Sequence, residues 1–148
     1  MVRVAVDAMG GDNAPGEIVK GCLLALQKSE AVKILLCGKE EILRQLVGQQ
    51  YPAERLEIVP ASEVIETGDV PVVSVRKKKD SSLVVGMKLI REERANAFVS
   101  AGNSGAILVG GQVLVGRLPG VERAPFAPLI PTEDGGVTLL LDSGANVD

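Results

Sequence analysis

The chain has 148 residues, of which 46% are hydrophobic and 24% charged, and its formal net charge is −3. This length is enough for one domain with a sizeable core, and the composition excludes disorder. The mild acidity and the 2% aromatic content argue against a nucleic-acid-binding protein, and the lack of histidine excludes Ser-His-Asp and Cys-His catalysis within the chain.

Cys22 and Cys37 lie inside apolar segments, and we expect both to be buried core residues in a protein of the reducing cytoplasm. Two cysteines without other ligands do not make a zinc site, so no metal is expected. No signal peptide is apparent at the N-terminus, and the apolar stretch 106–115 is too short to span a bilayer.

Apolar runs and helical periodicity alternate along the chain. The predicted strands are 2–6, 31–37, 56–59, 97–100 and 137–141. The predicted helices are 15–28, with Asp12 or Asn13 as its cap, 39–46, 82–93 and one that opens at 102–105. Between them, 61–80 is interpreted as a long functional loop with at most a short helical piece, and 119–131 as an extended linker.

This alternation of strands and helices predicts a single α/β domain over residues 1–148. We expect a doubly wound, mostly parallel sheet between two helical layers, the three-layer α/β/α architecture. Ligands of such sheets bind beyond the carboxyl ends of the strands. Three polar, glycine-containing segments follow predicted strands, at 7–13, 100–105 and 142–146, so the sequence predicts a site at this edge.

The first of these segments combines Gly10 and Gly11 with the polar residues Asp7, Asp12 and Asn13. The glycines would let backbone approach a substrate, and the following helix would offer amides to an anion. The alternative is a tight turn between strand and helix.

The second segment places Gly102 and Gly105 beside Ser100, Asn103 and Ser104 at a helix start. Free N–H groups there favour a phosphate or oxyanion site, and the alternative is a well-capped helix. No Walker A or GxGxxG motif occurs, so no nucleotide cofactor is expected.

The segment 76–82 contains four consecutive cations, Arg76 to Lys79, followed by a capping trio of Asp80, Ser81 and Ser82. It is either a solvated loop or an anion clamp that binds phosphate or steers an acidic partner. At the end of the chain, Asp142 and Asn146 follow a predicted strand that lacks a return helix, so we expect the chain to be the N-terminal part of a longer enzyme.

In combination, these segments resemble the PlsX-type phosphate acyltransferases. The motifs are DAMGGD at 7–12 with Pro15, KKKDSS at 77–82, SAGNSGA at 100–106 and LDSGAN at 141–146. The chain departs from the family at Ser104, where Thr is commoner, and at Ser143, where Val is commoner. The resemblance implies an isopropylmalate dehydrogenase-like fold and a soluble homodimer, in some members peripherally associated with the membrane.

The resemblance also implies a reaction, in which inorganic phosphate attacks the thioester of an acylated acyl carrier protein and long-chain acyl phosphate forms for phospholipid biosynthesis. Such a step needs an anion pocket and oxyanion donors rather than a nucleophilic side chain. Direct roles are then expected for Asn103, Ser104, Lys77 and Asp7. Substrate or phosphate binding is expected for Gly10, Gly11, Asn13, Lys78, Lys79, Ser81, Ser82, Ser100, Gly102, Gly105, Asp142 and Asn146.

Two other classes of protein remain open from the sequence. One is another enzyme of the same fold, in particular a short-chain phosphotransacetylase that uses coenzyme A thioesters. A decarboxylating dehydrogenase is disfavoured, because it needs a metal-binding aspartate cluster and a dinucleotide site. The other is a non-catalytic acyl- or anion-binding module, which would bind its ligand without releasing thiol.

Overall fold

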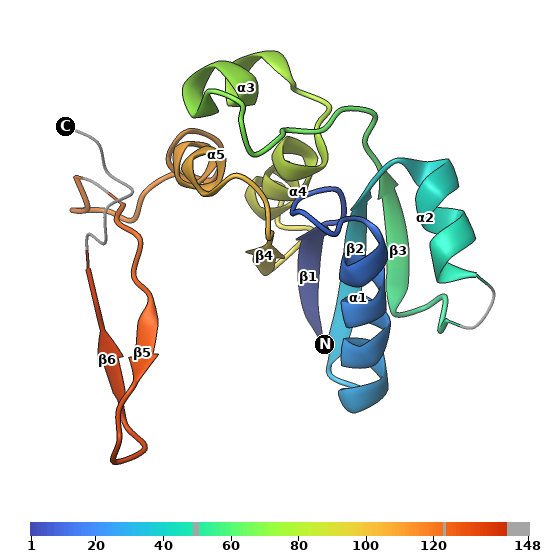
Figure 1. The fold of residues 1–148 in the computed structure, drawn as a ribbon, viewed down its shortest axis with the longest axis horizontal. Coiled ribbons are helices and arrows are strands. Elements are labelled where there is room, and N and C mark those ends of the chain that lie inside the picture. Colours follow the sequence, from blue (N-terminus) through green and yellow to red (C-terminus); the bar gives the residue numbers. More distant parts are fainter. Residues whose placement is uncertain (49–50, 123, 142–148) are drawn as a thin grey trace.

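The computed structural model describes residues 1–48, 51–122 and 124–141 (Figure 1). Its main body is a four-stranded parallel sheet with helices on both faces, which confirms the predicted doubly wound, three-layer α/β/α fold. The strands are β1 (Val2–Asp7), β2 (Val32–Gly38), β3 (Leu56–Pro60) and β4 (Ala97–Val99), and their spatial order is β3-β2-β1-β4.

The helices follow the predicted pattern. They are α1 (Gly16–Lys28), α2 (Glu40–Val47), α3 (Pro71–Lys77), α4 (Ser82–Arg91) and α5 (Ser104–Gly110), which continues as the π-helical turn η1 (Gly111–Val115). Helix α3 is the short helical piece allowed for in the segment 61–80, and it has Pro71 in its first turn. The predicted cap of α1 is wrong, because its N-cap residue is Pro15 and no side chain caps the helix.

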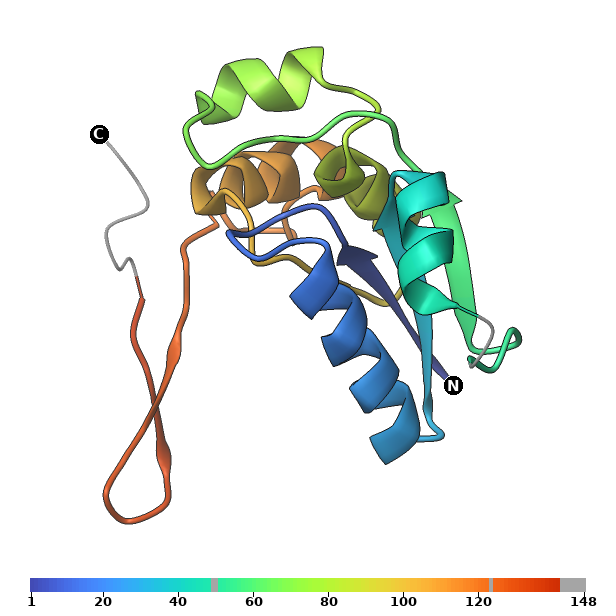
Figure 2. The same cartoon turned by 45° about the vertical axis from the view of Figure 1, so that its right-hand side comes forward.

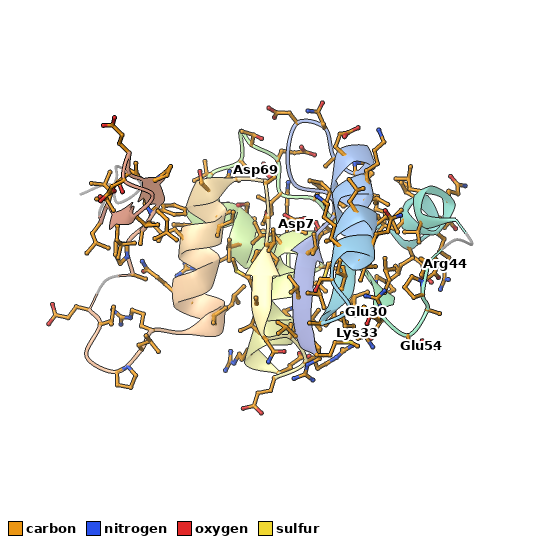
Figure 3. All side chains as sticks on the ribbon, turned by 90° about the horizontal axis from the view of Figure 1, so that it is seen from below. Asp7, Glu30, Lys33, Arg44, Glu54 and Asp69 are labelled. Atoms are coloured by element: carbon orange, nitrogen blue, oxygen red, sulfur yellow. The ribbon has the colours of Figure 1, made fainter. Side chains whose placement is uncertain are left out.

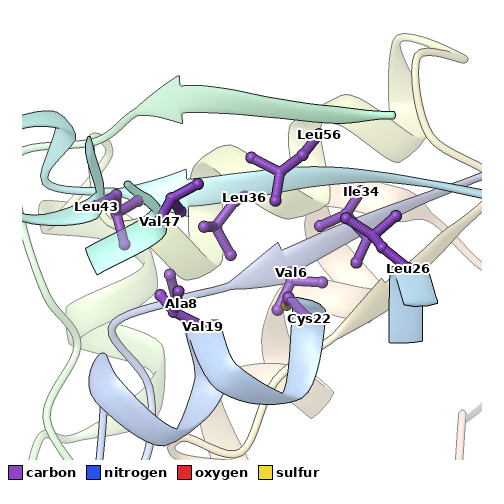
Figure 4. Packing of buried hydrophobic residues seen from close by; sticks show 10 residues of the cluster. All are labelled: Val6, Ala8, Val19, Cys22, Leu26, Ile34, Leu36, Leu43, Val47 and Leu56. Carbon is purple, nitrogen blue, oxygen red and sulfur yellow. The ribbon is translucent and has the colours of Figure 1, made fainter. Parts of the chain in front are cut away.

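The two faces of the sheet bury different residues because side chains alternate along a strand. On one face, Ile34 and Leu36 of β2 pack with Cys22 and Leu26 of α1 (Figure 4). On the other face, Leu35 and Cys37 of the same strand pack with Leu89 of α4. Helices α1 and α2 therefore form one outer layer, while α4, with α3 and α5 beside it, lies on the opposite side (Figure 2).

The end of the described chain departs from the prediction. Strand β6 (Val137–Leu139) does not join the parallel sheet but pairs antiparallel with β5 (Leu129–Pro131) in a separate hairpin (Figure 1). The reason lies in the connection, because Asp134, Gly135 and Gly136 supply a tight turn, with Gly135 at a φ of +79°, in place of a crossover helix. The predicted polar cluster at 142–146, with Asp142 and Asn146, lies outside the described residues.

The order of the strands determines where a site can form. From β1 the chain moves outward through β2 to β3 and then returns to place β4 on the other side of β1. The direction of winding therefore reverses between β1 and β4, and ligands of open α/β sheets bind at the carboxyl ends of the strands at this point. In the described part of the chain, no helix is both long and apolar enough to cross a membrane.

Candidate functional site at the carboxyl edge of the sheet

The two loops that follow β1 and β4 meet through a buried carboxylate. Asp7 is the last residue of β1 (Figure 3), and its side chain is buried, with an exposed fraction of 2%. Its Oδ2 accepts a hydrogen bond of 2.7 Å from the Ser100 hydroxyl, and its Oδ1 accepts one of 3.3 Å from the N–H of Met9. The Ser100 oxygen in turn accepts a hydrogen bond of 3.0 Å from the N–H of Gly102. Asp7 thus fixes both loops at the point where the winding of the sheet reverses.

Glycines allow these two loops to touch. A Cβ atom on Gly10 would overlap Oδ2 of Asp7, and one on Gly102 would lie 3.1 Å from the Cα of Gly10. Gly11 has a φ of +111°, which side chains rarely adopt, and packs against the backbone of Ala101. The structure therefore brings Asp7, Gly10, Gly11, Ser100 and Gly102 together, as the sequence predicted, and gives the glycines a packing role.

Asn103 joins the start of α5 to a distant loop. Its Oδ1 accepts a hydrogen bond of 2.9 Å from the N–H of Ala106, which caps the helix. Its Nδ2 donates to the carbonyl oxygens of Glu66, Thr67 and Asp69 at 3.2, 3.2 and 3.0 Å. The residue is only 7% exposed, so its side-chain amide points into the loop 66–69 rather than toward solvent.

The N–H groups beside Asn103 are placed differently. Helix geometry leaves those of Ser104 and Gly105 without an acceptor inside α5, and the Ser104 residue is exposed. A Cβ on Gly105 would lie 2.6 Å from Cγ of Pro71, so the first turn of α3 sits directly against the start of α5. The hydroxyl of Ser104 and these two amides are therefore the groups of this segment best placed to meet an anion.

The basic run lies at the far end of α3. Pro71 contacts Gly105, whereas Lys77 ends the helix, about 9 Å further along its axis at 1.5 Å per residue. The side chain of Lys78 points toward the segment that precedes α3, because its Nζ donates to Oδ2 of Asp69 at 2.5 Å and to the carbonyl of Val64 at 2.8 Å. Lys77 and Lys79 are exposed.

Lys78 and Asn103 consequently stabilise the same loop. The hydrogen bond from Lys78 holds the pKa of the Asp69 carboxyl below its ordinary value, with help from the N–H of Glu66. The carbonyl of Asp69 is one of the three that Asn103 binds. Glu66, Thr67 and Asp69 were not predicted as site residues, because backbone carbonyls leave no signal in side-chain patterns. Gly68 between polar residues signals only a turn.

The remaining residues that were predicted for the site do not lie with Asp7 and Asn103. Ser81 is fully buried and caps α4, since its hydroxyl donates to the carbonyl of Lys78 and accepts from the N–H of Val84. Ser82 is 1% exposed. Asn13 is exposed, and its carbonyl accepts the N–H of Glu17.

Both cysteines are buried, as predicted. Burial raises the pKa of the Cys22 thiol to about 11 and that of Cys37 to about 12, the latter with a contribution from the charge of Asp7. Both thiols are therefore protonated at neutral pH and unsuited to act as nucleophiles. Among the residues that the structure describes, no group of three or more metal-ligating side chains comes together.

Fold and loops together define a parallel α/β protein with a polar, glycine-rich edge at its switch point. A family model described as "Fatty acid synthesis protein" matches residues 2–148, and the chain belongs to this family. The resemblance to PlsX-type proteins is thereby confirmed.

Three curated relatives are each named "Phosphate acyltransferase", and each matches 99% of this chain. The protein of Thermoanaerobacter pseudethanolicus is 50% identical over 147 residues, which cover 43% of its length. The proteins of Halothermothrix orenii and Brevibacillus brevis are 47% and 48% identical, and 44% of the length of each is covered. The chain thus spans less than half the length of these relatives.

Proposed function

We propose that the protein takes part in phosphate acyltransfer, with acylated acyl carrier protein and inorganic phosphate as substrates and long-chain acyl phosphate as product. The observation that carries the proposal is the similarity to proteins named for this activity over 99% of the chain. The product would enter phospholipid biosynthesis. The protein would act in the cytoplasm as a homodimer, with peripheral association at the membrane.

In this reaction a phosphate oxygen attacks the thioester carbonyl, the C–S bond breaks, and the leaving thiolate takes up a proton. The negative charge on the carbonyl oxygen needs donors that are already in place, and the phosphate needs an anion site. The N–H groups of Ser104 and Gly105 and the Ser104 hydroxyl supply such donors. No nucleophilic side chain is required, which agrees with two buried, protonated thiols.

Our proposal revises the roles expected for Asn103 and Asp7. Because the amide of Asn103 is bound to three carbonyls, we assign it the positioning of α5 against the loop 66–69. Because Asp7 is buried and accepts from Ser100 and Met9, we assign it the alignment of the two glycine loops. Exposed Lys77 and Lys79 remain proposed as countercharge for phosphate or for the acidic carrier.

A chimera tests the proposal directly. Residues 2–148 replace the matching segment of the Thermoanaerobacter relative, and release of thiol from a long-chain acyl carrier protein thioester is followed with and without inorganic phosphate. We expect phosphate-dependent release together with acyl phosphate, at a rate near that of the parent relative. Release from coenzyme A thioesters alone would point to a short-chain phosphotransacetylase. Ligand binding without release of thiol, in a chimera that folds, would point to a binding module.

The role of the basic run is tested in the same assay. Lys77→Gln should raise the KM for the acyl carrier protein at low salt and leave kcat nearly unchanged, because the loss of a steering charge slows encounter rather than chemistry. Lys20→Gln removes another exposed lysine, from α1, and serves as the matched control. An equal KM for both variants would remove Lys77 from the proposed carrier interface.

A further inference from the structure

One cation of the basic run differs from its neighbours in sequence. The ammonium group of Lys78 is held by Oδ2 of Asp69 at 2.5 Å and by the carbonyl oxygen of Val64 at 2.8 Å. The side chains of Lys78 and Asp69 are 31% and 29% exposed, whereas Lys77 and Lys79 are exposed residues. The charge of Lys78 is therefore already compensated, and a phosphate could reach it only by displacing Asp69.

Asp69 connects Lys78 to Asn103. Its Oδ2 also accepts a hydrogen bond of 2.9 Å from the N–H of Glu66, and its own N–H donates to the carbonyl of Glu66 at 3.1 Å. Residues 66–69 thus form a turn that is closed by two internal hydrogen bonds. The carbonyl of Asp69 accepts from Nδ2 of Asn103 at 3.0 Å, so the contacts from Lys78 to Asn103 run through this one residue.

The start of α5 lies at the far end of these contacts. Asn103 caps the helix, because its Oδ1 accepts from the N–H of Ala106 at 2.9 Å. The oxygen and the nitrogen of Asn103 belong to one planar amide, so a shift of the turn that binds the nitrogen also moves the oxygen that caps α5. The position of Asp69 therefore affects the free N–H groups in the first turn of α5.

We propose that Lys78 is a positioning residue, which fixes the start of α5 through Asp69 and Asn103 and does not touch the substrate. This inference rests on the proposed function, in which the free N–H groups of that turn stabilise charge on the thioester carbonyl. Such donors act in the transition state, and a misplacement of about 1 Å can lower the rate on the order of 100-fold. A partly exposed ion pair adds little to stability, so the loss of Lys78 should affect kcat more than folding.

The kinetic test uses the chimera with the Thermoanaerobacter relative. Lys78→Gln should lower kcat about tenfold and leave the KM for the acyl carrier protein unchanged, the pattern of an interaction that matters only in the transition state. Lys78→Arg keeps a cation beside Asp69 and should restore most of kcat. Lys77→Gln is expected to show the opposite pattern. An unchanged kcat in Lys78→Gln, or a KM raised as in Lys77→Gln, would overturn the proposal.

Two further variants separate positioning from a general loss of stability. Asp69→Asn should also lower kcat, and the addition of Lys78→Gln to it should have little further effect, because both act through one contact. Independent, multiplicative effects would overturn the proposal. Lys33→Gln is the matched control and should leave kcat unchanged. Lys33 lies in β2 near the opposite edge of the sheet, is 30% exposed, and forms an ion pair of 3.2 Å with Glu57.

Hydrogen exchange in the chain itself gives a readout that needs no activity. The N–H groups of Ala106 and Ile107 are bonded to Asn103 and should exchange several-fold faster in Lys78→Gln, with no change in α1 or in Lys33→Gln. Thermal unfolding shows that each variant is folded. Unchanged exchange at the start of α5 would overturn the proposal. An unmodified chimera without phosphate-dependent release of thiol would instead overturn the proposed function, and faster exchange would still support the positioning of α5 by Lys78.

Discussion

Gly102 has no room for a side chain, because a Cβ atom there would lie 3.1 Å from the backbone of Gly10 and 3.2 Å from the Ser100 hydroxyl. Both neighbours belong to loops fixed by Asp7, so neither moves easily. We expect Gly102→Ala to lower the free energy of unfolding by about 1–3 kcal/mol, the usual range for overpacking. Urea denaturation measures this change.

The control for that variant is Gly21→Ala on α1. Gly21 is helical, and a Cβ atom there would have no neighbour within 4 Å, so alanine should raise stability by about 0.5–1 kcal/mol. If Gly102→Ala were as stable as Gly21→Ala, the two glycine loops would not be in close contact, and the role assigned to Asp7 would lose its basis.

Asn103 offers a second test at the level of one residue. Asn103→Asp keeps the oxygen that caps α5 but places a carboxylate against the carbonyls of Glu66, Thr67 and Asp69. Asn103→Ala loses both functions. Because three acceptors then face a negative charge, we expect the Asp variant to be at least as destabilised as the Ala variant, by about 1–3 kcal/mol. Thermal unfolding of both variants measures this, and a stable Asp variant would show that the cap alone matters.

Among the elements, the segment from β3 to α4 depends on two carboxylates. Asp69 is bound by Lys78, and Asp80 accepts from the hydroxyl and the N–H of Ser62; these hydrogen bonds lower both pKa values below the ordinary 3.8. In the unfolded chain these groups take up protons first as pH falls. The stabilisation of the folded segment by these two carboxylates is therefore present above about pH 4. It is lost as the pH falls through the lowered pKa values.

Hydrogen exchange followed by mass spectrometry measures this loss. After correction for intrinsic rates, amides of 61–80 should exchange faster at pH 3 than at pH 6, while those of α1 should not change to the same extent. The variant with Asp69→Asn and Asp80→Asn should exchange rapidly in this segment at both pH values. Protection that is independent of pH in the unmodified chain would contradict the assigned role of the two carboxylates.

The elements also show what sequence patterns can and cannot predict. The parallel strands were predictable because each is a nearly continuous apolar run, as in β2, where residues 34–37 are buried on both faces. A short helical piece was allowed for within 61–80, but the bounds of helix α3 were not predictable, because its exposed valines, Val72 and Val73, hide the helical period. The hairpin was missed although Asp134-Gly135 between two apolar runs is a recognised turn signal, since an α/β interpretation favoured another parallel strand.

At the scale of the molecule, the position of the candidate site followed from topology. The rule that ligands bind at the carboxyl edge predicted that the segments 7–13 and 100–105 lie on the same edge of the sheet. A hydrogen bond of 2.7 Å between Asp7 and Ser100 joins these segments across 93 residues of sequence. No such rule predicts the contact of Asn103 with the loop 66–69. The burial of Ser81 and Ser82 likewise depends on how α4 packs, which spacing alone does not reveal.

The hairpin gives a test of what the folded body requires. Strands β5 and β6 stand apart from the sheet (Figure 1), and their apolar side chains are open to solvent, with Leu129 and Val137 at 69% and 61% exposure. Burial of apolar surface is the main source of stability, so these residues contribute little to the fold of this chain. We expect a chain that ends at Gly116 to have a free energy of unfolding in urea within about 1 kcal/mol of that of the whole chain.

The same truncation should reduce self-association. Exposed apolar strands with unpaired edges promote contact between molecules, and the shortened chain lacks them. Sedimentation velocity at several concentrations compares the two forms. Because α5 and η1 pack on α4 upstream of the truncation, loss of the hairpin leaves the three layers and the Asp7–Ser100 contact in place. A truncated chain that fails to fold would mean that the hairpin stabilises the body through contacts with it, and that the four-stranded unit does not define the domain.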